Sequence, residues 1–286
     1  MLISILCSMA VNCSDNSEVE QQSEVTSLLD RPLYSDSGGD SLLTVIDNEL
    51  ESDPENTDIL HRKGLALDAL RRFNEAIEEY SKCITLDPNS SLFFRRRGHR
   101  YINIRQFEKA VTDLERAASI HEFEKTENLS YTDNLNWAIW YYLGLAYYLQ
   151  GDFDKALQPF QNSYAYSADN VSLLASTNWV HNTLRRLNRV EEAKKILEPI
   201  KEDMGFTGNY YKNILVYKGL KTETETFNIE EAELFELGTV GYGMGLWRLV
   251  NGDREGAFRI FRKIVEGESW EANGFMAAEA ELARSK

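Results

Sequence analysis

The sequence is short of proline, cysteine and long apolar runs. Five prolines among 286 residues leave room for long helices, because proline disrupts a helix interior. The three cysteines, Cys7, Cys13 and Cys83, show no C-x-x-C spacing that would predict a metal site. The apolar run at residues 2–11 has ten residues, which is too short to cross a bilayer.

Catalytic motifs are also missing. The chain has neither a glycine-rich phosphate loop nor a G-x-S-x-G turn around a nucleophilic serine. Its four histidines, at 61, 99, 121 and 181, are scattered, and His121 lacks the second histidine of a zinc-protease motif. We therefore predict a protein that is not an enzyme and needs no cofactor or metal.

Positive charge is in deficit, and the deficit is uneven. The net charge is -15, and residues 1–57 hold twelve acidic residues against one basic residue, Arg31. The remaining residues are nearly balanced, so no basic surface for a nucleic acid is predicted. An acidic, polar tail of this kind is typical of a solvated spacer.

The amino terminus resembles a bacterial lipoprotein signal. Residues 1–13 contain the apolar run and end in Ala10, Val11, Asn12 and Cys13, the cysteine that such a signal would acylate. Residues 14–39 are polar and acidic, and we predict a disordered tether. The resemblance implies a lipid-anchored or periplasmic protein of a bacterial envelope; a cytoplasmic protein is the alternative. Membrane attachment is expected only through lipidated Cys13.

The body of the chain repeats itself every 34 residues. Gly64 and Gly98 are 34 residues apart, as are Ala76 and Ala110. With the aromatic and aliphatic residues around them, they resemble the tetratricopeptide-repeat (TPR) pattern. The resemblance covers about 80% of the chain. It implies an all-α fold: a right-handed solenoid of antiparallel helix pairs with capping helices at both ends.

The repeat-like units are recognised by a small residue where two helices meet and by apolar residues at helical spacing. They are 57–90 (Leu60, Gly64, Leu67, Ala76, Tyr80, Cys83), 91–124 (Phe94, Gly98, Tyr101, Ala110, Leu114), 137–170 (Trp140, Gly144, Tyr147, Ala156, Phe160), 174–203 (Leu184, Ala193, Leu197, with His181 in place of glycine) and 238–270 (Gly245, Ala257, Phe261).

The period is broken twice. Residues 121–136 add twelve residues between the second and third units, and residues 204–237 form an irregular helical connection. Capping helices are expected near 41–51 and 274–284, which divides the chain into 40–203 (first cap and four units) and 238–286 (fifth unit and last cap). The stretch from Tyr211 to Ala280 resembles the carboxy-terminal module of uncharacterised bacterial TPR proteins.

The TPR resemblance implies a concave groove lined by the first helix of each unit. Mapping the usual groove positions onto this chain predicts a peptide-binding groove lined by His61, Arg95, His99, Asn103, Tyr141, Tyr148, Asn178, Asn182, Arg185 and Arg186. Arginines would bind carboxylates, and asparagines an extended backbone. Leu65 stands where TPR proteins that bind chaperone tails need asparagine, so that specificity is not expected.

The function we predict is that of a non-catalytic scaffold or adaptor that binds a protein or peptide segment. Three alternatives stay open. Arg95, Arg96 and Arg97 form a run that is often simply solvated. The break at 204–245, near Tyr210, Tyr211 and Tyr242, could hold a small molecule or an enzymatic site. The chain could also assemble with itself as a structural scaffold.

Overall fold

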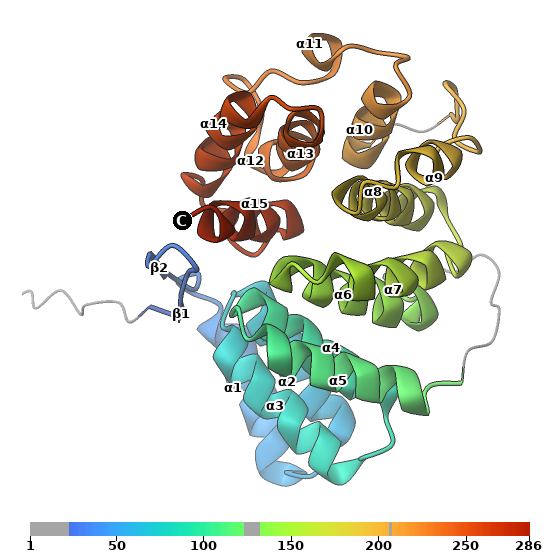
Figure 1. The fold of residues 1–286 in the computed structure, drawn as a ribbon. Helices are drawn as coiled ribbons and strands as arrows, with labels where there is room; N and C mark the ends of the chain where they lie inside the picture. Colours follow the sequence, from blue (N-terminus) through green and yellow to red (C-terminus); the bar gives the residue numbers. More distant parts are fainter. Residues whose placement is uncertain (1–22, 123–131, 206–207) are drawn as a thin grey trace, which may run out of the picture.

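The computed structural model describes residues 23–122, 132–205 and 208–286, and its helices pack in sequential pairs (Figure 1). The apolar run at 2–11 and Cys13 lie outside the described residues. Within the described ranges, no helix has both the length and the apolar character needed to span a bilayer. The repeating helix pairs confirm the TPR-like fold that the sequence predicts.

The N-terminal part contains one leading helix and four pairs. The leading helix is α1 (Asp40–Ser52). The pairs are α2 (Thr57–Ala69) with α3 (Phe73–Leu86), α4 (Ser91–Asn103) with α5 (Phe107–Ile120), α6 (Leu135–Gln150) with α7 (Phe153–Ala165), and α8 (Asn170–Arg186) with the short α9 (Val190–Lys195).

The C-terminal part starts with short helices where an irregular connection was expected. The elements are α10 (Asn209–Tyr217), α11 (Glu223–Thr226), α12 (Leu234–Glu236), a π-helical turn η1 (Leu237–Gly241), and the pair α13 (Tyr242–Val250) and α14 (Arg254–Val265). The last helix is α15 (Asn273–Arg284).

Glycine sits where the two helices of a unit approach most closely. A Cβ built on Gly64 would lie 2.6 Å from the ring of Tyr80, and one built on Gly144 would lie 2.7 Å from the ring of Phe160. Both distances are shorter than real Cβ contacts. The aromatic ring of the second helix therefore fills the space that the missing side chain leaves, as the repeat pattern predicts.

The turn between the paired helices uses a residue with positive φ in each unit. Gly151 and Gly252 do so at little cost, but Arg71 (φ 54°) and Arg105 (φ 62°), which are 34 residues apart, do so as well. The left-handed conformation costs a non-glycine residue about 1 kcal/mol. Both arginines reach the C-terminal segment: Arg71 donates to the Glu268 carbonyl oxygen, and Arg105 binds Glu279.

The C-terminal helix lies inside the curve of the solenoid rather than at an outer end. Besides its neighbour α14, α15 contacts α13, η1 and the distant α6 (Figure 1). Asn273 donates to the Tyr141 hydroxyl at 3.2 Å, and Arg284 donates to the Leu149 carbonyl oxygen at 2.9 Å. The expectation of a simple end cap was therefore wrong, because this helix fills the concave side of the third unit.

Part of the predicted tether is ordered. Residues 23–39 contain a small antiparallel hairpin, β1 (Val25–Thr26) and β2 (Pro32–Leu33). The Leu28 amide donates to Glu279 Oε1 at 3.2 Å, and Trp270 Nε1 donates to the Tyr34 carbonyl oxygen at 3.1 Å. The prediction of a disordered tether over 14–39 is corrected for these residues, since their polar composition does not reveal backbone bonds to α15.

His181 replaces the glycine of the fourth unit and is fully packed. It is 2% exposed, stacks on Tyr217 with ring centroids 4.4 Å apart, and donates from Nδ1 to the Ala193 carbonyl oxygen. Its Nε2 is buried without a partner. Burial lowers the pKa of His181 from 6.5 to about 4, so the folded protein holds this imidazole neutral.

Acidification is expected to destabilise the protein through His181. Between pH 6.5 and about 4 the unfolded chain binds a proton that the folded chain excludes, so stability is lost as pH falls through this window. The loss from this residue is about 2 kcal/mol between about pH 7 and pH 5. Urea denaturation of the parent and of His181→Gln at both pH values measures it. Equal losses in the two proteins would contradict the assignment.

Candidate protein-binding surface

The C-terminal half of the predicted groove is occupied by the chain itself. The Tyr148 hydroxyl bonds to that of Tyr242 at 2.7 Å, and the Tyr141 hydroxyl accepts from Trp179 Nε1 at 2.8 Å. The buried residues of this half are Asn103, Tyr141, Tyr148, Asn178 and Asn182, each 1–2% exposed or less. They were predicted to contact a peptide, and the structure corrects this, because α10, α13 and α15 cover them.

The tyrosines of the 204–245 break also serve packing. Tyr210 bonds to the Tyr141 hydroxyl at 3.1 Å, Tyr211 donates to the Lys201 carbonyl oxygen at 2.8 Å, and Tyr242 is 2% exposed. None of the three lines a cavity described for this part of the chain. Arg185 and Arg186 lie apart from them, in a cleft treated below.

The N-terminal half of the predicted groove holds a group of basic side chains on α2 and α4. We call it the basic cluster; it consists of His61, Arg95, Arg96, His99 and Arg100. Three of these residues were predicted from the repeat positions. The other two, Arg96 and Arg100, follow Arg95 and His99 directly and share their side of α4. The helical spacing of the sequence could have indicated them.

Arg95 is the unusual member of the basic cluster. It is 5% exposed, yet it makes no hydrogen bond or ion pair to any described residue, and its Nε is buried without a partner. Its nearest aromatic neighbour is Tyr142 of α6, whose ring centroid lies 5.9 Å from the guanidinium carbon. The expectation that the arginine run is simply solvated therefore fails for Arg95.

Arg97, the third arginine of the run, is paired. Its Nε and a terminal nitrogen donate to the two carboxylate oxygens of Asp113 at 2.7 and 2.8 Å. Arg96 is half-buried, and its Nε has no partner. Neighbouring side chains of one run thus differ: one is neutralised inside the fold, and two are left without a counter-charge.

Electrostatics in the basic cluster disfavour further positive charge. Burial, with Arg96 as the next cause, lowers the pKa of Arg95 to about 10 and that of His61 to about 4. Burial and Arg100 lower the pKa of His99 well below its usual value. At neutral pH the histidines are therefore neutral and the arginines charged.

Only one buried carboxylate faces these arginines. Asp68 of α2 lies 3.4 Å from Arg100 Nε and accepts from the Tyr80 hydroxyl at 2.7 Å. Three guanidinium groups against this single carboxylate leave an excess of positive charge. An uncompensated buried charge costs several kcal/mol, so an external anion would be bound favourably here.

A flat aromatic surface adjoins the charge. His99 stacks on Tyr142 with ring centroids 3.7 Å apart and an interplanar angle of 24°. Both side chains are half-buried. Guanidinium groups next to half-buried rings suit an acidic segment that also carries apolar side chains. Among the described residues no group of three or more metal-ligating side chains is found.

Two tetratricopeptide-repeat family models match the chain, one over residues 57–90 and one over residues 95–170. A curated relative, the BBSome complex member BBS4 of Bos taurus, is 26% identical over 123 residues, which are 43% of this chain and 21% of that protein. The chain therefore spans about a fifth of that relative.

Solved structures share the fold at low identity. YrrB, described as a TPR protein with an unusual peptide-binding site, is 14% identical with a TM-score of 0.47, over 83% of this chain and 97% of that one. The APC/C hetero-tetramer Cut9–Hcn1 has 12% identity and a TM-score of 0.50, over 80% of this chain and 36% of that one. Tetratricopeptide repeats typically mediate protein–protein interactions. With the matched repeats, the helix pairs and the glycine contacts together, the chain is a tetratricopeptide-repeat protein.

Proposed function

We propose that this protein is a non-catalytic scaffold that binds an acidic segment of a protein partner at the basic cluster. The observation that carries the proposal is the buried guanidinium of Arg95, which has no counter-charge among the described residues. A fold that buries a charge and leaves it unpaired is destabilised. A carboxylate supplied by a partner would remove that penalty.

The location of the site follows from how the chain fills its own concave side. The C-terminal helices occupy the half of the concave face next to α6 and α8, where Tyr148 and Asn178 are buried. The face next to α2 and α4 keeps the half-buried His61 and Arg96. A partner segment is therefore expected along α2 and α4, with its carboxylates at Arg95 and Arg96.

Selection from a random peptide library displayed on phage tests the proposal. Peptides captured by the parent protein are expected to be enriched in aspartate and glutamate. Arg96→Gln is expected to weaken their binding at least tenfold, because it removes a charge-assisted hydrogen bond. Arg62→Gln is the matched control, since Arg62 is exposed on α2 and pairs with Glu49. Captured peptides without acidic enrichment, or equal losses in both variants, would contradict the proposal.

A stability measurement tests the same site without a partner. Arg95→Met removes the unpaired charge and keeps the length of the side chain. It is expected to raise the free energy of unfolding by about 1–3 kcal/mol while abolishing binding of the selected peptides. Arg97→Met is the control and is expected to lower stability, because it leaves Asp113 unpaired. If Arg95→Met destabilised the isolated protein, Arg95 would already have a partner within the fold.

Attachment to a bacterial envelope is a separate part of the proposal. It comes from the resemblance of residues 1–13 to a lipoprotein signal, which the described residues do not include. Mass spectrometry of the protein purified from its native cell would find an acylated Cys13 at the mature amino terminus. An unmodified Cys13 in that material would rule the attachment out.

A further inference from the structure

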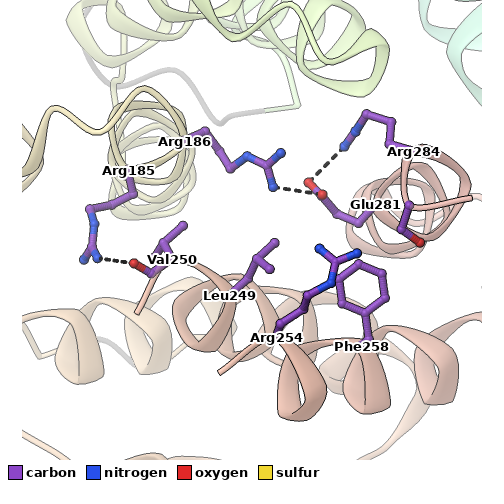
Figure 2. Close-up of a pocket in the computed structure, with 9 residues that line it drawn as sticks. Arg185, Arg186, Leu249, Val250, Arg254, Phe258, Glu281 and Arg284 are labelled. Carbon is purple, nitrogen blue, oxygen red and sulfur yellow. Dashed lines mark hydrogen bonds and ion pairs between the residues drawn. The ribbon is translucent and has the colours of Figure 1, made fainter. Parts of the chain in front are cut away.

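A cleft opens between the ends of four helices, away from the basic cluster (Figure 2). It has a volume of about 540 Å³, which is in the range of small-ligand sites. Its walls come from the end of α8, the end of α13, the start of α14 and the end of α15. The charged lining residues are Arg185, Arg186, Arg254, Arg284 and Glu281.

Three of the arginines are held in place by the fold. Figure 2 shows Arg186 and Arg284 pointing at Glu281 from opposite sides, with N···O distances of 2.8 and 2.9 Å. The Glu281 side chain is 4% exposed, so its charge is used up inside the fold. Arg185 donates to Asn251 Oδ1 at 2.9 Å. These contacts leave several guanidinium N–H donors of the three side chains without a protein acceptor.

Arg254 is different, because it makes no hydrogen bond or ion pair to any described residue. Its guanidinium carbon lies 4.4 Å from the ring centroid of Phe258. Figure 2 shows the guanidinium group extending from α14 toward the centre of the cleft, on the side where Glu281 lies. The aromatic ring thus holds the group in position while its donors point into open space.

The lining has four guanidinium groups and one carboxylate, an excess of three positive charges. Planar guanidinium groups bind the oxygens of phosphates in pairs, and several of them together suit a ligand with more than one negative charge. Leu249, Val250 and Phe258 supply apolar wall beside them. The cleft therefore offers charge for an oligophosphate and contact area for an attached organic group.

We propose that this cleft binds a small molecule that carries a diphosphate or longer phosphate chain. The phosphates lie between Arg254, Arg186 and Arg284, and the organic part contacts Leu249 and Phe258. The site is independent of the basic cluster, since the two share no residue. It also differs from the small-molecule site expected near the tyrosines of the 204–245 break, because no tyrosine lines it.

Isothermal titration of the full-length protein with inorganic pyrophosphate tests the proposal, with sodium chloride added to matched ionic strength as the blank. Saturable binding of one pyrophosphate per chain is expected. Arg254→Gln is expected to weaken it at least tenfold, and the variant should fold normally because Arg254 holds no partner. Arg262→Gln is the matched control: it removes an exposed arginine from the same helix, outside the cleft.

Three outcomes would overturn the proposal. The first is a heat of dilution only, with no saturation. The second is an equal loss in Arg254→Gln and Arg262→Gln, which would mean that pyrophosphate responds to overall charge. The third is a loss in Arg96→Gln but not in Arg254→Gln, which would place the anion in the basic cluster. Only this third outcome bears on the peptide-binding proposal, so the two proposals fail separately.

Discussion

Replacing Gly274 with alanine is expected to detach α15 and to lower the free energy of unfolding by about 3 kcal/mol or more. The added Cβ would lie 1.6 Å from the carbonyl oxygen of Gly238 and 2.7 Å from its carbonyl carbon. Both are backbone atoms of η1, so no side-chain rotation relieves the clash. The helix must move away, and with it the contacts that α15 makes to α6.

Gly238→Ala is the matched control on the other side of this contact. A Cβ there would lie 3.6 Å from Ala272 Cβ, an ordinary van der Waals distance. Its effect is expected to stay within about 1 kcal/mol, and helix propensity favours alanine by a similar amount. Urea denaturation followed by circular dichroism measures both variants. Equal stabilities for them would show that η1 and α15 do not meet as closely as described.

Replacing Arg105 with alanine is expected to cost about 3–5 kcal/mol. Arg105 Nε lies 2.9 Å from Glu279 Oε2, and the two side chains are 3% and 1% exposed. A terminal nitrogen of Arg105 also donates to the Trp270 carbonyl oxygen at 2.9 Å. The truncation leaves Glu279 charged and buried without its partner, which is the costly way to break a buried ion pair.

Two further variants separate the pair from its position. Arg62→Ala breaks the surface pair with Glu49, whose side chains are 52% and 42% exposed, and is expected to cost less than about 1 kcal/mol. The double change Arg105→Met with Glu279→Leu removes both charges and is expected to recover most of the loss. A double variant as unstable as Arg105→Ala would mean that the backbone contacts of Arg105, not its charge, hold α15.

Local features of the fold could be predicted from the sequence. The spaces left by Gly64 and Gly144, and the aromatic rings of Tyr80 and Phe160 that fill them, follow from residues of the same unit. The 34-residue period carries this information because both partners of each contact lie within it. Helix existence and pairing were therefore predictable, and the structure confirms the TPR-like fold.

Long-range features could not be predicted. Whether Tyr148 lines an open groove or bonds to Tyr242 depends on how far the solenoid curves over 94 residues. Small rotations at each unit add up, and no motif states their sum. The same reason explains the hairpin at 23–39, since its anchor Glu279 is 251 residues from Leu28. A groove model taken from the repeats alone therefore overestimated the open surface.

The basic cluster was predicted in part. The repeat positions brought His61, Arg95 and His99 together on neighbouring helices, and the structure places them so. The absence of a partner for Arg95 could not be read from the sequence, because three adjacent arginines look alike there. Only Asp113, on the next helix, distinguishes Arg97 from the others.

The contact between the hairpin and α15 changes how this repeat protein is expected to fold and unfold. In an open array each unit touches only its neighbours, so the units can melt one after another. Here Leu28 and Glu279 bond across 251 residues, and Arg105 joins the same carboxylate from the second unit. Such high contact order slows folding, and it ties early and late units into one cooperative transition. Loss of α15 is then expected to loosen the second and third units together, rather than only the last one.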